Sequence, residues 1–139
     1  MDFEVGLDDS VPCVWVRAHG KVTGEGVRAA TNAVVEHPRW RRGMSVLADY
    51  RGVEGYHLGP ADVVDLARLM GPFAAQLGEG RLALVLRPGL VYGMARVWRV
   101  HASFQFLMDV GVFRGLEQAH LWIGQAAVRA PPPADPELV

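Results

Sequence analysis

The sequence predicts a single α/β domain in which helices flank a mixed β-sheet, with the element order ββαβαβαβα. Two stretches near the N-terminus alternate apolar and polar residues, as the strands of a hairpin do. After them, short apolar runs alternate with segments of helical periodicity, which is typical of parallel strands joined by right-handed crossovers. The length of 139 residues, with 50% hydrophobic and 21% charged residues, suits one globular domain.

The first half of the chain predicts a hairpin, a helix and a buried strand. Phe3 to Leu7 and Val14 to Ala18 are the alternating stretches that would form the hairpin. Thr23 suits the N-cap of a helix that ends at His37-Pro38. Met44 to Asp49 is short and apolar, and a polar, glycine-containing stretch follows it. We therefore expect a buried strand that leads into a loop at Asp49.

The second half predicts two further strands and three helices. Proline suits the first turn of a helix, so the second helix is expected to begin at Gly59-Pro60, and Gly71-Pro72 should interrupt it. The remaining predicted elements are a strand at Arg81–Leu86, a third helix from about Leu90 to Phe106, a strand at Val110–Phe113 and a closing helix at Leu116–Ile123.

The domain is expected to cover residues 1–125, and residues 126–139 form a proline-rich tail that we expect to be disordered, since Pro131-Pro132-Pro133 sustains neither helix nor sheet. The N-terminus has no apolar segment typical of a signal peptide, and the apolar runs are far shorter than a transmembrane segment. We expect a cytoplasmic protein. Cys13 is the only cysteine, which excludes an internal disulfide, and its apolar neighbours predict a small buried side chain.

Several strings of residues resemble the SpoIIAA-like family of the STAS superfamily, over about residues 3–124. The last of these strings has the strand followed by a helix with a Glu-Ala and Trp pattern that is habitual at the end of that family. The strings are Gly20-Lys21-Val22-Thr23, Val46-Leu47-Ala48-Asp49-Tyr50-Arg51-Gly52-Val53-Glu54, Val91-Tyr92-Gly93-Met94-Ala95-Arg96 and Val112-Phe113-Arg114-Gly115-Leu116-Glu117-Gln118-Ala119-His120-Leu121-Trp122.

The resemblance implies a STAS-like α/β fold and a regulatory or binding role. The best-known STAS proteins are anti-sigma factor antagonists, which a kinase phosphorylates on a serine or threonine at the start of the helix after the third strand. The corresponding stretch here, Tyr50 to Leu66, has neither residue, so we expect no phosphorylation site. The resemblance also implies nucleotide-binding, lipid-binding and protein-interaction modules as possible roles.

A candidate ligand site follows from the expected parallel strands, because ligands bind at the carboxyl ends of such strands. The loops there, from Asp49 to Gly59 and from Arg87 to Tyr92, carry a carboxylate, cations, phenols and a histidine, which could orient a polar or anionic ligand. Alternatively, Asp49 pairs with Arg51 or Arg96 and only stabilises the fold. The candidate ligand-binding residues are Asp49, Arg51, Tyr56, His57, Arg87, Tyr92 and Arg96.

No pattern of residues predicts a catalytic site, a metal site or a cofactor. The histidines do not have metal-ligand spacing, and no nucleophile sits beside His57. Arg39-Trp40-Arg41-Arg42 is the one basic cluster, and with a net charge of −1 it is too small for a nucleic-acid partner. Surplus apolar residues on the second and third helices favour a homodimer; they are Leu69, Phe73, Leu90, Val100 and Phe106.

The leading functional hypothesis is a non-enzymatic STAS-like binding or regulatory module. Its partner would be a protein or a small anionic or amphipathic ligand, held at the carboxyl ends of the strands. The alternative is a small enzyme that uses Asp49 or His57 as an acid or base in a cleft there.

Overall fold

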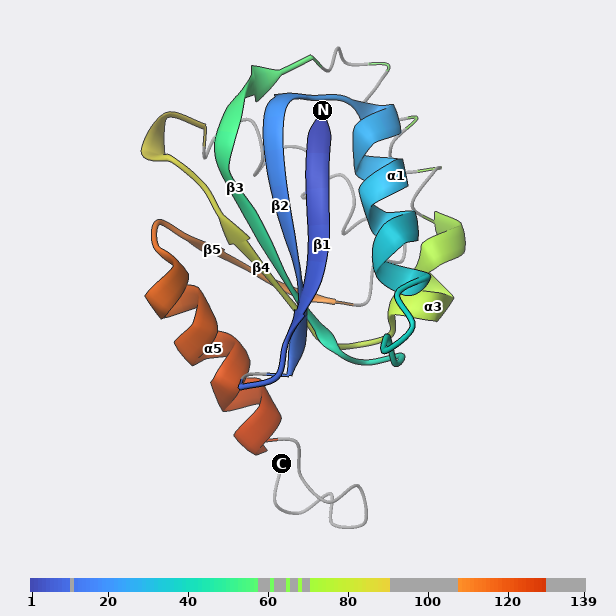
Figure 1. Ribbon diagram of the computed structural model, residues 1–139, viewed down its shortest axis with the longest axis vertical. Helices are drawn as coiled ribbons and strands as arrows, with labels where there is room; N and C mark the ends of the chain where they lie inside the picture. Colours follow the sequence, from blue (N-terminus) through green and yellow to red (C-terminus); the bar gives the residue numbers. More distant parts are fainter. Residues whose placement is uncertain are drawn as a thin grey trace.

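The computed structural model of the chain describes residues 1–10, 12–57, 61, 65, 68, 71–90 and 108–129. Within them lies one five-stranded sheet with the strands in sequence order, β1-β2-β3-β4-β5 (Figure 1). The predicted third helix falls almost wholly outside the described residues, as do Tyr92, Arg96 and the tail from residue 130.

The sheet is mixed, as predicted. β1 (Asp2–Asp8) pairs antiparallel with β2 (Cys13–Val22), which confirms the hairpin. β3 (Ser45–Tyr56), β4 (Arg81–Val85) and β5 (Asp109–Phe113) then follow β2 in parallel.

The first helix, α1 (Gly24–Val35), begins where the sequence predicts. The side-chain oxygen of Thr23 accepts a hydrogen bond of 3.0 Å from the backbone N–H of Gly26, which confirms Thr23 as the N-cap. Such a cap contributes about 1 kcal/mol to helix stability. Val27, Ala30 and Val34 recur at helical spacing and are buried against the sheet.

The end of the predicted second helix also has the expected interruption. Ala61, Asp65 and Arg68 are helical, and a 3₁₀ turn, η1 (Gly71–Phe73), precedes the short helix α3 (Ala74–Leu77). Proline lacks the N–H that a continuous helix needs, which explains the change of geometry at this position.

The expectation of a loop starting at Asp49 is wrong, because β3 continues to Tyr56. The sequence from Asp49 to Gly52 is polar and contains glycine, which argued against a strand. Two register shifts in the pairing of β2 with β3, at Arg17/His19 and at Gly20/Lys21, accompany this polar stretch while the pairing continues. Irregularities of this kind bend a strand and re-aim its side chains without ending the sheet.

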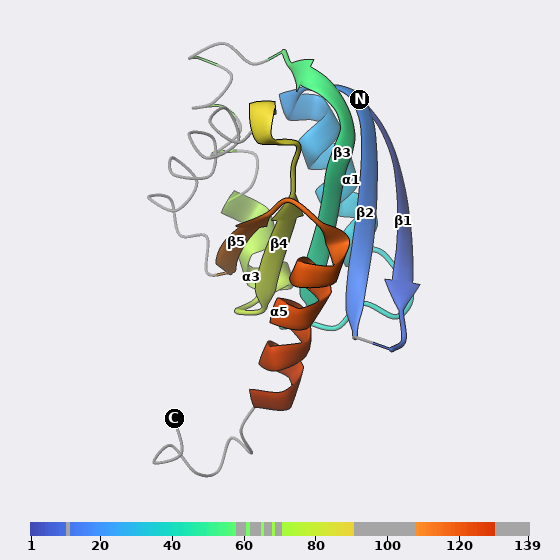
Figure 2. The same ribbon diagram turned by 90° about the vertical axis from the view of Figure 1, so that its left-hand side faces the viewer.

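The two faces of the sheet pack against different helices (Figures 1 and 2). The main core joins α1 and α3 to one face, through residues such as Val16, Val46 and Leu84. On the other face, α5 (Leu116–Arg129) packs on β3, β4 and β5 through Ala119 and Ile123. Figure 2 shows that α5 leaves β1 and most of β2 uncovered on this side.

Two further sequence predictions can be compared with these elements. α5 extends to Arg129, beyond the predicted end at Ile123. Cys13 is fully buried, as expected, and burial, followed by the negative charge of Asp8, raises the pKa of its thiol to about 12. At neutral pH the thiol is therefore protonated and weakly nucleophilic.

None of the helices in the described part of the chain is both long and apolar enough to cross a membrane.

Candidate anion-binding site

The candidate site is built on a row of residues that the sheet register aligns across three strands. Asp49 of β3 is opposite Val85 of β4, and Val85 is opposite Phe113 of β5. Alternate residues of a strand share a face, and neighbouring strands lie about 4.8 Å apart. Arg51 and Arg87, each two residues beyond this row, therefore belong to adjacent chain segments, Arg51 within β3 and Arg87 just after the end of β4.

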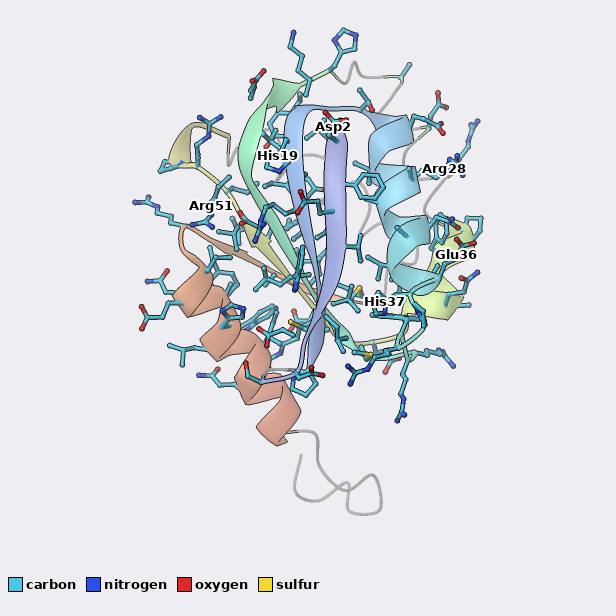
Figure 3. All side chains as sticks on the ribbon, viewed as in Figure 1. Asp2, His19, Arg28, Glu36, His37 and Arg51 are labelled. Carbon is cyan, nitrogen blue, oxygen red and sulfur yellow. The ribbon has the colours of Figure 1, made fainter. Side chains whose placement is uncertain are left out.

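Asp49 binds one edge of the Arg51 guanidinium through a bidentate pair of hydrogen bonds. Nε and Nη2 of Arg51 donate hydrogen bonds of 2.9 Å to Oδ1 and Oδ2 of Asp49, and the backbone N–H of Arg51 donates another of 3.2 Å to Oδ1. The Asp49 side chain is 9% exposed, whereas that of Arg51 is 44% exposed. The buried carboxylate of Asp49 thus fixes the position of the half-exposed guanidinium of Arg51. Figure 3 shows Arg51 on the α5 side of the sheet.

The electrostatics of the pair keep both groups charged. Burial alone would raise the pKa of Asp49, but the hydrogen bonds and charge of Arg51, together with the charge of Arg17, lower it overall. Arg17 is directly opposite Asp49 in the pairing of β2 with β3. The hydrogen bond to Asp49 in turn raises the pKa of Arg51. At neutral pH Asp49 is an anion and does not serve as a general acid.

Two more arginines belong to this end of the sheet. Nη2 of Arg87 donates a short hydrogen bond to the backbone carbonyl oxygen of Val53, which ties the end of β4 to β3. Arg114 directly follows β5, is exposed, and precedes the start of α5. Among the described residues, Arg114 makes no ion pair. We call Arg51, Arg87 and Arg114 the arginine edge.

Arg114 was missed by sequence reasoning although a signal was present. The predicted site takes in the loops after the third and fourth strands, although ligands bind at the carboxyl ends of parallel strands in general. Val110 to Phe113 was predicted as the next strand, so the same rule extends to the residue that follows it.

Other candidate residues lie elsewhere on the sheet. β3 rises about 3.3 Å per residue, which places Tyr56 and His57 roughly 20 Å from Asp49. Tyr56 packs against the main core, and burial raises its pKa to about 12. His57 is exposed, and its backbone N–H donates to the carbonyl oxygen of Val22 at 2.8 Å.

This separation bears on the enzyme alternative, in which Asp49 or His57 acts as an acid or base at the carboxyl ends of the strands. A general acid and base that act on one substrate lie within hydrogen-bond reach of the reacting atoms. Asp49 and His57, roughly 20 Å apart, therefore do not act as an acid and base pair on one substrate. In the described part of the chain, no group of three or more histidine, cysteine, aspartate or glutamate residues is arranged to hold a metal ion.

Comparisons with known proteins bear on the fold. No protein-family model matches the sequence, and no curated protein matches it. Among solved structures, the chain is similar to an uncharacterised protein of the DUF3478 family, with a SpoIIAA-like fold, from Shewanella loihica. The TM-score is 0.57 and the sequence identity is 15%, over 88% of this chain and 92% of that one. The protein therefore has a SpoIIAA-like α/β fold, as the resemblance in its sequence implied.

Proposed function

We propose that the protein is a non-enzymatic binding module that recognises an anionic group on a protein partner or a small ligand. The recognising surface is the arginine edge, and the anion is a carboxylate or a phosphate, because the planar guanidinium group matches both. The alternative is a small enzyme that uses Asp49 or His57 in a cleft there, but the two residues lie too far apart along β3 to act together on one substrate.

The observation that carries the proposal is the geometry of Arg51. A guanidinium has five N–H donors. Asp49 takes two of them in the fork of 2.9 Å hydrogen bonds, and within the described part of the chain no residue takes the other three, which are available to a ligand. Because Asp49 already fixes the orientation of the group, a ligand loses little side-chain entropy when it binds.

The charge balance of the site also favours an anion. Asp49 neutralises one of the three cations of the arginine edge, and the hydrogen bond of Arg87 goes to a neutral carbonyl group. The remaining positive charge lies near the first turn of α5, where the N–H groups of a helix favour anions and where Glu117 adds one carboxylate. The exposure of Arg51 and Arg114 makes the site accessible to a group carried on a larger molecule.

A calorimetric titration with inorganic phosphate at constant ionic strength tests the proposal. We expect the wild-type protein to bind phosphate, and Arg51→Gln to weaken binding by about tenfold or more, as the loss of a charge-assisted hydrogen bond does.

Arg28→Gln is the matched control. Arg28 also pairs with a carboxylate, Glu25, at 2.7 Å, and its side chain is 41% exposed, but it lies on α1 at the opposite side of the sheet (Figure 3). Equal phosphate affinity in the two variants would contradict the proposal.

A further inference from the structure

A second concave site lies at the other end of the parallel strands from the arginine edge. The turn of the β1–β2 hairpin forms one wall and the loop between α1 and β3 forms the other, and they enclose a cleft of about 490 Å³. Ligand pockets in proteins typically have volumes of about 300–1,000 Å³. The loop wall carries Arg39, Trp40 and Arg41, which belong to the one basic cluster in the sequence.

Hydrogen bonds hold the loop wall in one shape. The indole Nε1–H of Trp40 donates to the carbonyl oxygen of Gln76 at 3.1 Å, which fixes the plane of the ring. Arg41 and Met44 are joined twice: the Met44 N–H donates to the Arg41 carbonyl oxygen at 3.0 Å, and the Arg41 N–H donates to the Met44 sulfur at 3.1 Å. A cleft with walls of this kind is largely preformed, which lowers the entropic cost of binding.

The acidic residues of the cleft already have partners. Asp9 forms an ion pair of 2.9 Å with Arg39, from one wall to the other. Asp8 accepts hydrogen bonds from the backbone and the hydroxyl of Ser10, at 3.0 and 2.7 Å. In the described part of the chain, the guanidinium of Arg41 has no ion pair, although it lines the cleft. The two carboxylates and the two arginines of the cleft balance in formal charge, and the Asp8 carboxylate also lies 3.4 Å from His120 Nε2. Arg41 is therefore the cation of the cleft that is left to pair with an anionic ligand.

We propose that this cleft binds a planar aromatic molecule that bears one carboxylate or phosphate group. The anionic group pairs with Arg41, and the ring packs against the indole of Trp40 and the apolar side chains of Leu7 and Met44. This site is separate from the arginine edge, so the two proposals stand or fall independently.

The test follows the Trp40 indole signal in a proton–nitrogen correlation NMR spectrum. The chain has 4 tryptophans, and Trp40→Phe identifies the signal of Trp40. The probes are naphthoate and naphthyl phosphate, which carry both features, naphthylmethanol, which has the ring without the charge, and inorganic phosphate, which has the charge without a ring. We expect the first two to shift the Trp40 signal saturably, with the other two about tenfold or more weaker. Whichever of naphthoate and naphthyl phosphate binds with the higher affinity shows whether the cleft prefers a carboxylate or a phosphate.

Arg41→Gln should weaken the binding of both aromatic anions by about tenfold or more, since it removes the pairing cation. Arg42→Gln is the matched control, because Arg42 is the next arginine and does not line the cleft. Arg51→Gln should leave this binding unchanged, which separates the cleft from the arginine edge. An unmoved Trp40 signal, equal affinity for the neutral and the charged ring, or equal effects of Arg41→Gln and Arg42→Gln would overturn the proposal.

Discussion

The carboxylate of Asp49 binds the guanidinium of Arg51 through two hydrogen bonds, although only Tyr50 separates them in the sequence. Side chains two residues apart on a strand point to the same face, while the one between them points to the other. Tyr50 is accordingly buried in the main core, on the α1 side. One short piece of β3 thus anchors the strand on one face and presents an ion pair on the other.

Asp49→Asn should lower the free energy of unfolding at pH 7 by about 1–2 kcal/mol, because it removes the charge that Arg51 binds while keeping the shape. The folded protein lowers the pKa of Asp49, so its stabilisation is present above the ordinary aspartate pKa of about 4 and is lost as the pH falls through the lower folded value. Urea unfolding at pH 7 and at pH 3 checks this. A difference between wild type and variant that does not shrink at pH 3 would show that charge is not its source.

Gly6→Ala should destabilise the protein by about 1–3 kcal/mol, as overpacking does. Gly6 is opposite Trp15 in the register of β1 with β2, and a methyl group on Gly6 would overlap the indole ring. Gly55→Ala is the control, since Gly55 is also in a strand but has open space where the methyl group would go. Thermal unfolding of both variants measures the difference, and equal melting temperatures would refute the close packing of Trp15 on Gly6.

Arg81→Met should destabilise the contact of α5 with the sheet by about 1–3 kcal/mol. The guanidinium of Arg81 lies 4.6 Å from the ring centroid of Trp122 and donates a 2.8 Å hydrogen bond to its carbonyl oxygen. Arg17 also lies over a tryptophan, Trp15, at 5.2 Å, but its side chain is 50% exposed against 16% for Arg81. Urea unfolding should therefore show a clearly smaller loss for Arg17→Met, and an equal or larger loss would contradict this assignment.

Among the described residues, the order of the elements was predictable because several of them have a strong local signal. Thr23 caps α1 through its own side chain, and Pro72 breaks the helical geometry through its missing N–H. The apolar run that begins at Arg81 has the length of a buried strand. These signals depend on neighbouring residues alone, so tertiary structure did not override them.

The true length of β3 was not predictable from local pattern. In its second half Arg51, Gly52 and Glu54 are exposed, because α5 packs mainly on β4 and β5 and covers β3 only in part. Which part of a strand a distant helix covers is not visible in the local sequence. The same error affected the predicted site. A loop after Asp49 would have placed Tyr56 and His57 near it, whereas the extended strand places them far along the sheet. The pairing of Asp49 with Arg51, by contrast, was one of two pairings that the sequence left open, and the structure forms it.

The homodimer stays a prediction. Of the apolar residues on which it rested, Phe73 packs against the main core of its own chain, which removes it as evidence for an interface. The side chains of the others, Leu69, Leu90, Val100 and Phe106, lie outside the described residues.

The central claim is that Arg51, mounted on Asp49, offers its free donors to an anion. The most direct measurement follows the Nε–H signals of individual arginines by NMR while inorganic phosphate is added at constant ionic strength. We expect the signals of Arg51 and Arg87 to shift saturably and that of Arg28 to stay in place, because only the first two belong to the arginine edge. If phosphate moves none of these signals, or moves Arg28 as much as Arg51, the protein does not bind anions at this edge.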